Sequence, residues 1–225
     1  MSATIPNLDF VELHTGPEPK WTVVWLHGLG ADGHDFEAIV PELVRPNWPS
    51  IRFVFPHAPV RPVTVNGGAR MRAWYDILGP SLAEKQDIPG VESSVAAIEL
   101  LLQAEIARGC PPERLILAGF SQGGAITLAR GLTREQPLAG LVVLSSYVPI
   151  HEHLLPKTAA AAPSMPLFMA HGSLDPVVPE ALGKLSKDLL EGVGMKPQWH
   201  SYPMAHQVCL EEIRDLADWL EKRFQ

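Results

Sequence analysis

The chain has 225 residues, of which 46% are hydrophobic, and its length predicts one domain, residues 1–225, with one sizeable core. Its 18 basic and 25 acidic side chains give a net charge of −7 without a basic cluster, which argues against nucleic acid or an anionic membrane surface as a partner. Residues 1–16 have no basic stretch followed by an apolar one, and no segment is long enough to span a bilayer, so we expect a cytoplasmic protein without stable membrane insertion.

Short runs rich in valine, isoleucine and leucine alternate with longer amphipathic segments, which is typical of a mostly parallel sheet flanked by helices. We expect strands at residues 10–13, 21–26, 51–55, 115–118, 140–144, 167–170 and 198–202. We expect helices at residues 35–44, 91–108, 123–132, 179–191 and 211–222. The sequence therefore predicts an α/β fold.

Two connections interrupt this alternation. Residues 56–90 form a long segment rich in proline and glycine, and its apolar and aromatic residues, Trp74 among them, argue against disorder, so we expect it to line a pocket. Residues 151–166 contain an alanine run and predict a flexible surface loop that is too short to be a large lid.

The sequence Gly119-Phe-Ser-Gln-Gly-Gly124 lies between an apolar strand and a helical segment. This is the context of a nucleophile elbow, in which the glycines before and after the serine prevent side-chain collisions in a strained turn. An ordinary tight turn is the alternative, but the flanking strand and helix make it a poorer explanation. We therefore predict that Ser121 is a nucleophile directed at a carbonyl carbon.

An acid and a base follow two later strands. Asp175 comes after the strand at residues 167–170, and His206 comes after the strand at residues 198–202. In parallel sheets, sites form at the carboxyl ends of strands, and the order serine, aspartate, histidine is the one expected of an α/β hydrolase. We predict that His206 takes the serine proton and that Asp175 orients the imidazole.

Such chemistry also needs donors for an oxyanion. The backbone amide of Gln122 is predicted to supply one, because it begins the helix after the elbow. The turn His27-Gly-Leu-Gly30, after the strand at residues 21–26, is predicted to supply the second through the amide of Leu29. His27 is expected to fix this turn by a local hydrogen bond.

Together these segments resemble the phospholipase/carboxylesterase family of α/β hydrolases, which includes bacterial carboxylesterases and acyl-protein thioesterases. The resemblance rests on His27–Phe36, Pro62–Gly68, Arg72–Ile77, Gly119–Gly124, His171–Pro179 and Met204–Cys209.

The resemblance implies an α/β-hydrolase fold with little or no lid and a serine esterase with catalytic Ser121, Asp175 and His206. It also implies oxyanion donors at Leu29 and Gln122, and substrate contacts in the loop around Trp74 and Leu78. No metal or cofactor is implied. The substrate would be a small-molecule or lipid-like acyl ester, and since some members pair near the active site, a homodimer is compatible with it.

Two positions depart from the family pattern: Ala205 replaces a common glycine before the histidine, and the segment Ser145-Ser-Tyr147 often contains glycine in relatives. Both affect the expected substrate preference rather than the reacting groups. Ester and thioester substrates remain open, and a peptidase or a non-catalytic binding module of the same fold are the alternatives. His151 and His153 lack a third ligand for a metal, and Cys110 and Cys209 are expected to be reduced thiols.

Overall fold

The computed structural model describes residues 8–79, 82 and 86–224. Its central sheet has seven strands in the order β1-β3-β2-β6-β7-β8-β9. Their bounds are β1 Phe10–His14, β2 Trp21–Leu26, β3 Ile51–Pro56, β6 Leu115–Phe120, β7 Gly140–Leu144, β8 Leu167–Gly172 and β9 Pro197–Tyr202. Only β1 runs antiparallel to its neighbour, so the prediction of a mostly parallel sheet is confirmed.

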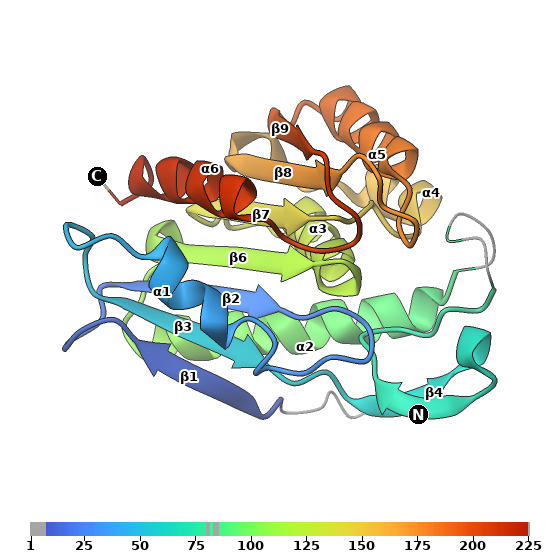
Figure 1. Cartoon of the computed structure of the whole chain (residues 1–225), viewed down its shortest axis with the longest axis horizontal. Coiled ribbons are helices and arrows are strands. Elements are labelled where there is room, and N and C mark those ends of the chain that lie inside the picture. The colour runs from blue at the N-terminus through green and yellow to red at the C-terminus, as the bar shows by residue number, and fades with distance from the viewer. Residues whose placement is uncertain (1–7, 80–81, 83–85, 225) are drawn as a thin grey trace.

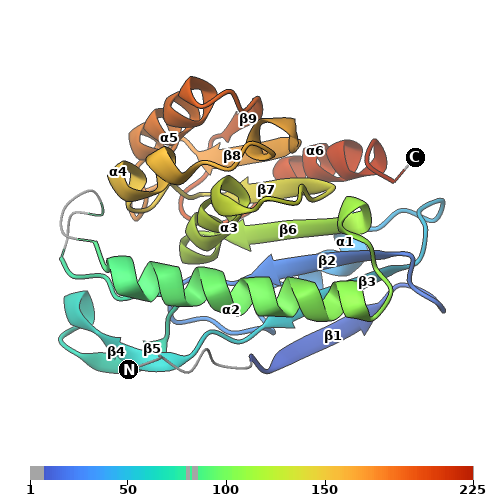
Figure 2. The same ribbon diagram turned by 180° about the vertical axis from the view of Figure 1, so that it is seen from behind.

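The helices cover both faces of this sheet. Their bounds are α1 Val40–Leu43, α2 Ile88–Ala107, α3 Gln122–Thr133, α4 His151–Leu154, α5 Glu180–Gly192 and α6 Leu210–Glu221. Helices α1 and α6 lie on the face toward the viewer in Figure 1, and α2 and α3 lie on the opposite face, which Figure 2 brings to the front. Within the described residues, no helix is long and apolar enough to cross a membrane.

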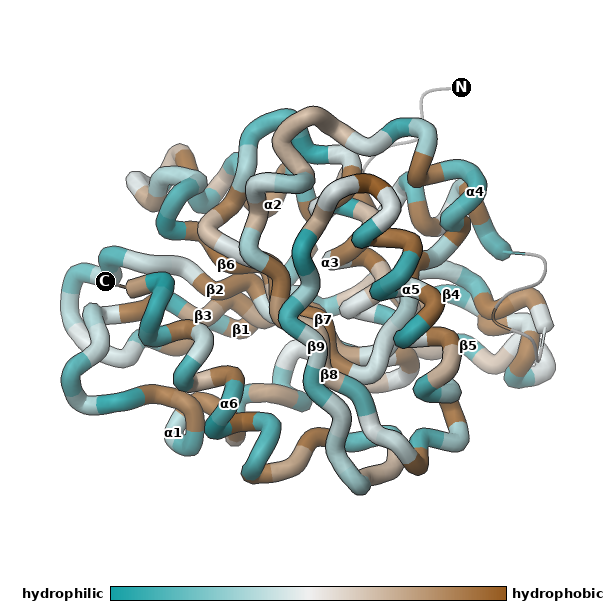
Figure 3. Tube along the Cα trace, turned by 90° about the horizontal axis from the view of Figure 1, so that it is seen from above, coloured by the Kyte–Doolittle hydropathy of each residue, from teal (hydrophilic) through white to brown (hydrophobic). Residues whose placement is uncertain are grey.

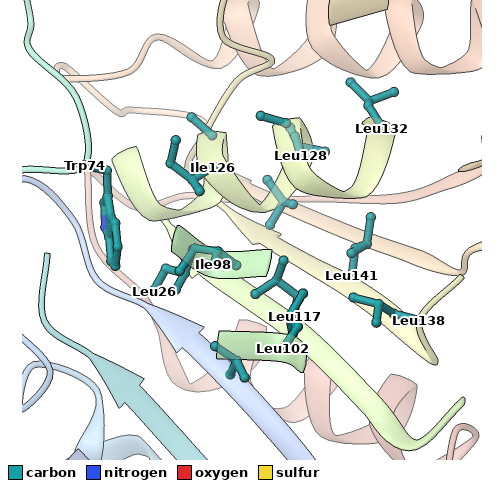
Figure 4. Packing of buried hydrophobic residues seen from close by; sticks show 14 of the residues in the cluster. Leu26, Trp74, Ile98, Leu102, Leu117, Ile126, Leu128, Leu132, Leu138 and Leu141 are labelled. Carbon is teal, nitrogen blue, oxygen red and sulfur yellow. The ribbon is translucent and has the colours of Figure 1, made fainter. Parts of the chain in front are cut away.

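Each face of the sheet buries its own hydrophobic cluster, and Figure 3 shows hydrophobic residues concentrated along the central strands. The cluster beneath α2 and α3 includes Leu102 and Leu117, and Figure 4 shows Trp74 at one end of it. The cluster beneath α1 and α6 includes Phe53 and Trp219. Burial on both faces explains why the central strands are almost continuously apolar in the sequence.

Two sequence-based expectations are wrong. The segment predicted as one helix over residues 35–44 is a 3₁₀ turn, Glu37–Ile39, followed by the short α1, which ends where Val44 becomes extended shortly before Pro46. The predicted flexible loop at residues 151–166 instead forms α4 and two 3₁₀ turns, Leu155–Lys157 and Ala162–Ser164. It is ordered because its apolar side chains, including Leu154 and Met165, are buried in the core.

The connection at residues 56–90 contains a two-stranded hairpin that the sequence reading missed. Its strands are β4 Val60–Val63 and β5 Ala69–Arg72, and they pair with each other rather than with the central sheet. The hairpin lies at the end of the molecule toward which the parallel strands point (Figure 1). The loops after β2, β6, β8 and β9 meet at this same end, which brings distant parts of the sequence together.

Candidate active site

Ser121 sits at the bend between β6 and α3 with φ 55° and ψ −120°, a conformation that a non-glycine residue rarely adopts. A Cβ atom at Gly119 would lie 2.4 Å from the carbonyl of Gly123, and one at Gly123 would lie 2.3 Å from the carbonyl oxygen of Leu26. Only glycine fits at either position. The strained turn therefore has the geometry of the predicted elbow.

Three residues that are distant in the sequence form one hydrogen-bonded line. His206 Nε2 is 2.8 Å from Ser121 Oγ, and His206 Nδ1 is 2.6 Å from Asp175 Oδ2. Ser121 comes from the loop after β6, Asp175 from the loop after β8 and His206 from the loop after β9. The structure thus brings together the three side chains that the sequence singled out, in hydrogen-bonding contact.

Asp175 is held on both of its oxygens. Oδ1 accepts hydrogen bonds from the backbone amides of Val177 and Val178, at 2.8 and 2.9 Å, while Oδ2 faces His206. His171, which the sequence reading did not single out, bonds through Nε2 to the carbonyl of Val178 at 2.8 Å. Burial lowers the pKa of His171, so this ring is a neutral brace for the aspartate loop.

The two predicted oxyanion donors line the same cavity as Ser121. The amide of Gln122 is the first in α3, where helix geometry leaves it without an intrahelical acceptor. In the described parts of the chain the amide of Leu29 likewise has no internal acceptor. Both amides are therefore available to a negatively charged oxygen near Ser121.

His27 fixes the turn that carries Leu29, which confirms its expected local role. Its Nε2 accepts from the amide of Ala58 at 3.0 Å, so its Nδ1 donates to the carbonyl of Gly28 at 2.7 Å. Burial lowers the pKa of His27 to about 4, and the ring is neutral at physiological pH. It is a structural group rather than an acid or a base.

Trp74 is fully buried and is not among the residues that line this cavity, so its contact with substrate stays a prediction. Its indole N–H donates to the carbonyl of His27 at 2.9 Å, and its backbone N–H donates to Oε1 of Gln122 at 2.7 Å. The next residue, Tyr75, lines the cavity instead. The sequence identified the right segment, but spacing does not reveal which side chain of an irregular loop faces inward.

Leu78 is 41% exposed and lies between two cavity-lining residues, Ile77 and Gly79. Its contact with substrate stays a prediction. The cavity has a volume of about 260 Å³, and its apolar walls also include Val177 and Val178.

The segment that departs from the family pattern supports the elbow. Ser146 donates its hydroxyl proton to the carbonyl of Ser121 at 2.6 Å, and a Cβ atom at Gly124 would collide with it. Tyr147 lines the cavity, with its hydroxyl 2.9 Å from that of Tyr75. Ala205 does not have a positive φ, so its backbone does not call for glycine.

The remaining titratable candidates do not form a second site. His153 bonds to Glu92 at 2.7 Å, and among the described residues no group of three or more histidine, cysteine or acidic side chains could hold a metal ion. Cys110 and Cys209 are both free, as expected, and burial raises the pKa of the Cys110 thiol.

A parallel sheet with a serine elbow, and with an aspartate and a histidine on later loops, defines the class of the α/β hydrolases. Comparison with known proteins narrows this class. Residues 9–224 match the model of the phospholipase/carboxylesterase family, and the chain belongs to that family. It is therefore a carboxylic-ester hydrolase.

Individual proteins of known sequence or structure are also similar to this chain. The chain is 40% identical over 212 residues to acyl-protein thioesterase 1 of Neurospora crassa, covering 90% of this chain and 86% of that protein. The crystal structure of Arabidopsis thaliana SOBER1 superposes with a TM-score of 0.85 at 31% identity, covering 91% of this chain and 99% of that one. Zea mays acyl-protein thioesterase 2 superposes with a TM-score of 0.81 at 28% identity, covering 96% and 99%.

Proposed function

We propose that this protein hydrolyses acyl esters and thioesters through a covalent acyl-enzyme on Ser121. The observation that carries the proposal is the continuous line of hydrogen bonds from Asp175 through His206 to a serine held at positive φ. A serine hydroxyl is a weak nucleophile at neutral pH and needs an adjacent base. Here His206 is placed to act as that base, and Asp175 is placed to orient its imidazole.

In the proposed first step, His206 Nε2 accepts the proton of Ser121 Oγ while that oxygen attacks the acyl carbonyl carbon. The carbonyl oxygen becomes an oxyanion, and the amides of Leu29 and Gln122 donate to it. When the tetrahedral intermediate collapses, the bond to the leaving group breaks, and His206 returns the proton to the departing sulfur or oxygen. Ser121 is then acylated.

In the second step, His206 activates a water molecule, which attacks the acyl-enzyme. A second oxyanion forms at the same amides, and its collapse releases the carboxylic acid and restores the serine proton. Asp175 stays ionised throughout and stabilises the imidazolium that exists in both steps. The substrate and one water molecule supply all the atoms that the two steps consume, and His206 carries the proton in each.

The substrate is proposed to carry an apolar acyl chain. Support comes from the apolar cavity walls near Ser121, formed by side chains such as Ile77 and Val177. The relatives named acyl-protein thioesterase 1 favour a thioester, although esters and thioesters need the same triad and the same amides.

A fluorophosphonate probe tests the nucleophile. We expect it to label the wild-type protein on Ser121 and to leave Ser121→Ala unlabelled, while His206→Ala is labelled far more slowly. Ser164→Ala is the matched control, because it removes an exposed hydroxyl that bonds to the carbonyl of Ala161 within its own 3₁₀ turn. Equal labelling of Ser121→Ala and wild type would reject the assignment.

Turnover distinguishes the esterase from the alternatives. An esterase hydrolyses p-nitrophenyl octanoate in a Ser121-dependent way, whereas a binding module that retains the fold does not hydrolyse any ester. A peptidase would also cleave peptide amides in a Ser121-dependent way, whereas the proposed esterase should leave them intact.

A further inference from the structure

A second groove opens beside His206, away from the cavity that holds Leu29 and Gln122. It has a volume of about 380 Å³ and lies between the start of α1 and the loop that leads from His206 into α6. Its floor is apolar and consists of Phe36, Ile39, Phe120, Val208 and Ile213. Nothing in the proposed chemistry so far has used this groove.

The carboxylates at this groove are Asp35 and Glu42, and the ring of His206 lines it as well. Within the described parts of the chain, neither carboxylate has an ion-pair or hydrogen-bond partner, and no lysine or arginine among those residues lines the groove. Partial burial and the neighbouring charge of Asp32 raise the pKa of Asp35, as expected for an uncompensated acid. The groove therefore favours a ligand that is apolar at its centre and positively charged at its edge.

The geometry of the proposed reaction determines which part of a substrate lies near this groove. The acyl carbon must lie beside Ser121 with its oxygen at the amides of Leu29 and Gln122, which all line the other cavity. His206 must deliver its proton to the leaving atom, so the leaving group lies on the imidazole side. His206 and the following Gln207 line the second groove, which makes it the continuation of the leaving-group path.

We propose that this groove is a leaving-group subsite for a peptide thiol flanked by apolar and basic residues. The proposal rests on the proposed esterase and thioesterase function and adds the chemistry of the group released. Lysine or arginine beside the acylated cysteine would approach Asp35 and Glu42, and apolar neighbours would cover the floor. A glycerophosphocholine leaving group suits the groove less well, because its phosphate would bring negative charge toward the same carboxylates.

Matched peptide substrates test the proposal. Each carries S-octanoyl cysteine, flanked by lysine in one and by glutamate in the other, and the readout is the ratio of their kcat/KM values. This ratio reports acylation, because the acyl-enzyme that follows is identical. We expect the wild type to favour the lysine peptide by roughly tenfold at low salt, with the ratio falling as ionic strength rises.

The double variant Asp35→Asn, Glu42→Gln should lower this ratio to below about twofold. The matched control is Glu113→Gln, Glu135→Gln, which removes the same charge near the amino ends of β6 and β7, at the opposite end of the sheet, and should keep the wild-type ratio. An unchanged ratio in the Asp35, Glu42 variant, or no preference in the wild type, would overturn the proposal.

Two further arms separate the possible failures. Absence of Ser121-dependent hydrolysis of p-nitrophenyl octanoate would reject the proposed function itself, whereas normal hydrolysis with no charge preference would reject the subsite alone. Octanoyl glycerophosphocholine should be hydrolysed at least as well by the Asp35, Glu42 variant as by the wild type. A selective loss on that ester would assign the groove to a choline headgroup and contradict the peptide proposal.

Discussion

Asp175 uses both carboxylate oxygens, one for two backbone amides and one for His206. Asp175→Asn would keep an acceptor for the amides of Val177 and Val178 but would present an N–H group toward His206 Nδ1. The imidazole would then prefer the tautomer that cannot accept the serine proton. We predict a fall in kcat of about four orders of magnitude with little change in folding.

Steady-state hydrolysis of p-nitrophenyl octanoate and circular dichroism check this together. A loss of activity accompanied by unfolding would only show a structural role for the carboxylate. Activity within tenfold of wild type, in a folded variant, would contradict the tautomer argument.

Glu212 is a buried acid outside the proposed triad, and unlike the equally buried Glu105 it has no ion-pair partner among the described residues. It is 1% exposed near the start of α6, and neither carboxylate oxygen has a hydrogen-bond partner in the described structure. Burial raises the pKa of the Glu212 carboxyl to about 8. The side chain is therefore mainly protonated in the folded protein at pH 7.

This shift gives a stability prediction with a definite sign. Because the folded state holds the Glu212 proton more tightly than the unfolded state, stability from this group is fully present below the unfolded pKa of 4.5 and is lost as pH rises through about 8. Glu212→Gln keeps the shape without the charge. We expect its free energy of unfolding at pH 9 to exceed that of the wild type by ~1–3 kcal/mol, so that it unfolds at a higher temperature. At pH 5 the difference should be much smaller.

Thermal unfolding of the variant and the wild type, followed by circular dichroism at both pH values, measures this difference in stability. Glu211→Gln, on the exposed side of the same helical turn, is the control and should show a smaller pH dependence. An equal effect of Glu212→Gln at both pH values would mean that the buried acid does not titrate as described.

At the scale of elements, the active site depends on how closely α3 approaches β2. A Cβ atom at Gly123 would lie 2.3 Å from the carbonyl oxygen of Leu26 and 2.6 Å from that of His27. Gly123→Ala must therefore push the elbow away from the turn that carries Leu29. We predict a loss of at least roughly a hundredfold in kcat/KM, the scale expected when an oxyanion donor is misplaced.

Gly192→Ala is the comparison, since an added Cβ at the end of α5 would meet no atom within 4 Å. It should leave kcat/KM close to wild type. Retention of full activity by Gly123→Ala would show that the elbow tolerates the displacement.

Sequence patterns predicted the central strands well because strands such as β2 and β7 are buried on both faces. Their sequences are therefore continuous apolar runs, which are easy to recognise. The patterns missed the β4–β5 hairpin, whose strands contain arginines and a proline and cover no core face. Sequence patterns also failed to predict the short helices in residues 151–166. The buried side chains there, such as Leu154 and Met165, are scattered and are separated by prolines, so they form no helical repeat. Local signals fail where tertiary contacts determine the structure.

At the scale of the whole molecule, the sheet separates two cores, and the site rests on the one beneath α2 and α3. Leu102 is fully buried in that core, whereas Leu100, on the same helix, is 50% exposed. Leu102→Ala should destabilise the protein by ~2–5 kcal/mol, since it leaves a cavity, and Leu100→Ala should have a small effect. Urea unfolding of both variants measures the difference, and equal destabilisation would contradict the placement of this core.

The grouping of Ser121, Asp175 and His206 could be predicted because each comes shortly after a strand, and parallel topology brings those loops to one end of the sheet. The second groove could not be predicted. Its walls combine residues 35–42, Phe120 and residues 206–213, and only the packing of α1 beside α6 places them together. The same limit explains why Trp74 rather than Tyr75 was expected in the cavity.

Formation of an acyl-enzyme on Ser121 is the central claim and can be observed directly. Mixing the protein with excess p-nitrophenyl octanoate, quenching in acid within milliseconds and measuring peptide masses should place one octanoyl group on the peptide containing Ser121. The adduct should form as p-nitrophenol is released and should decay as octanoate appears. Continued turnover by Ser121→Ala at the wild-type rate, or an adduct on a different residue, would contradict the account.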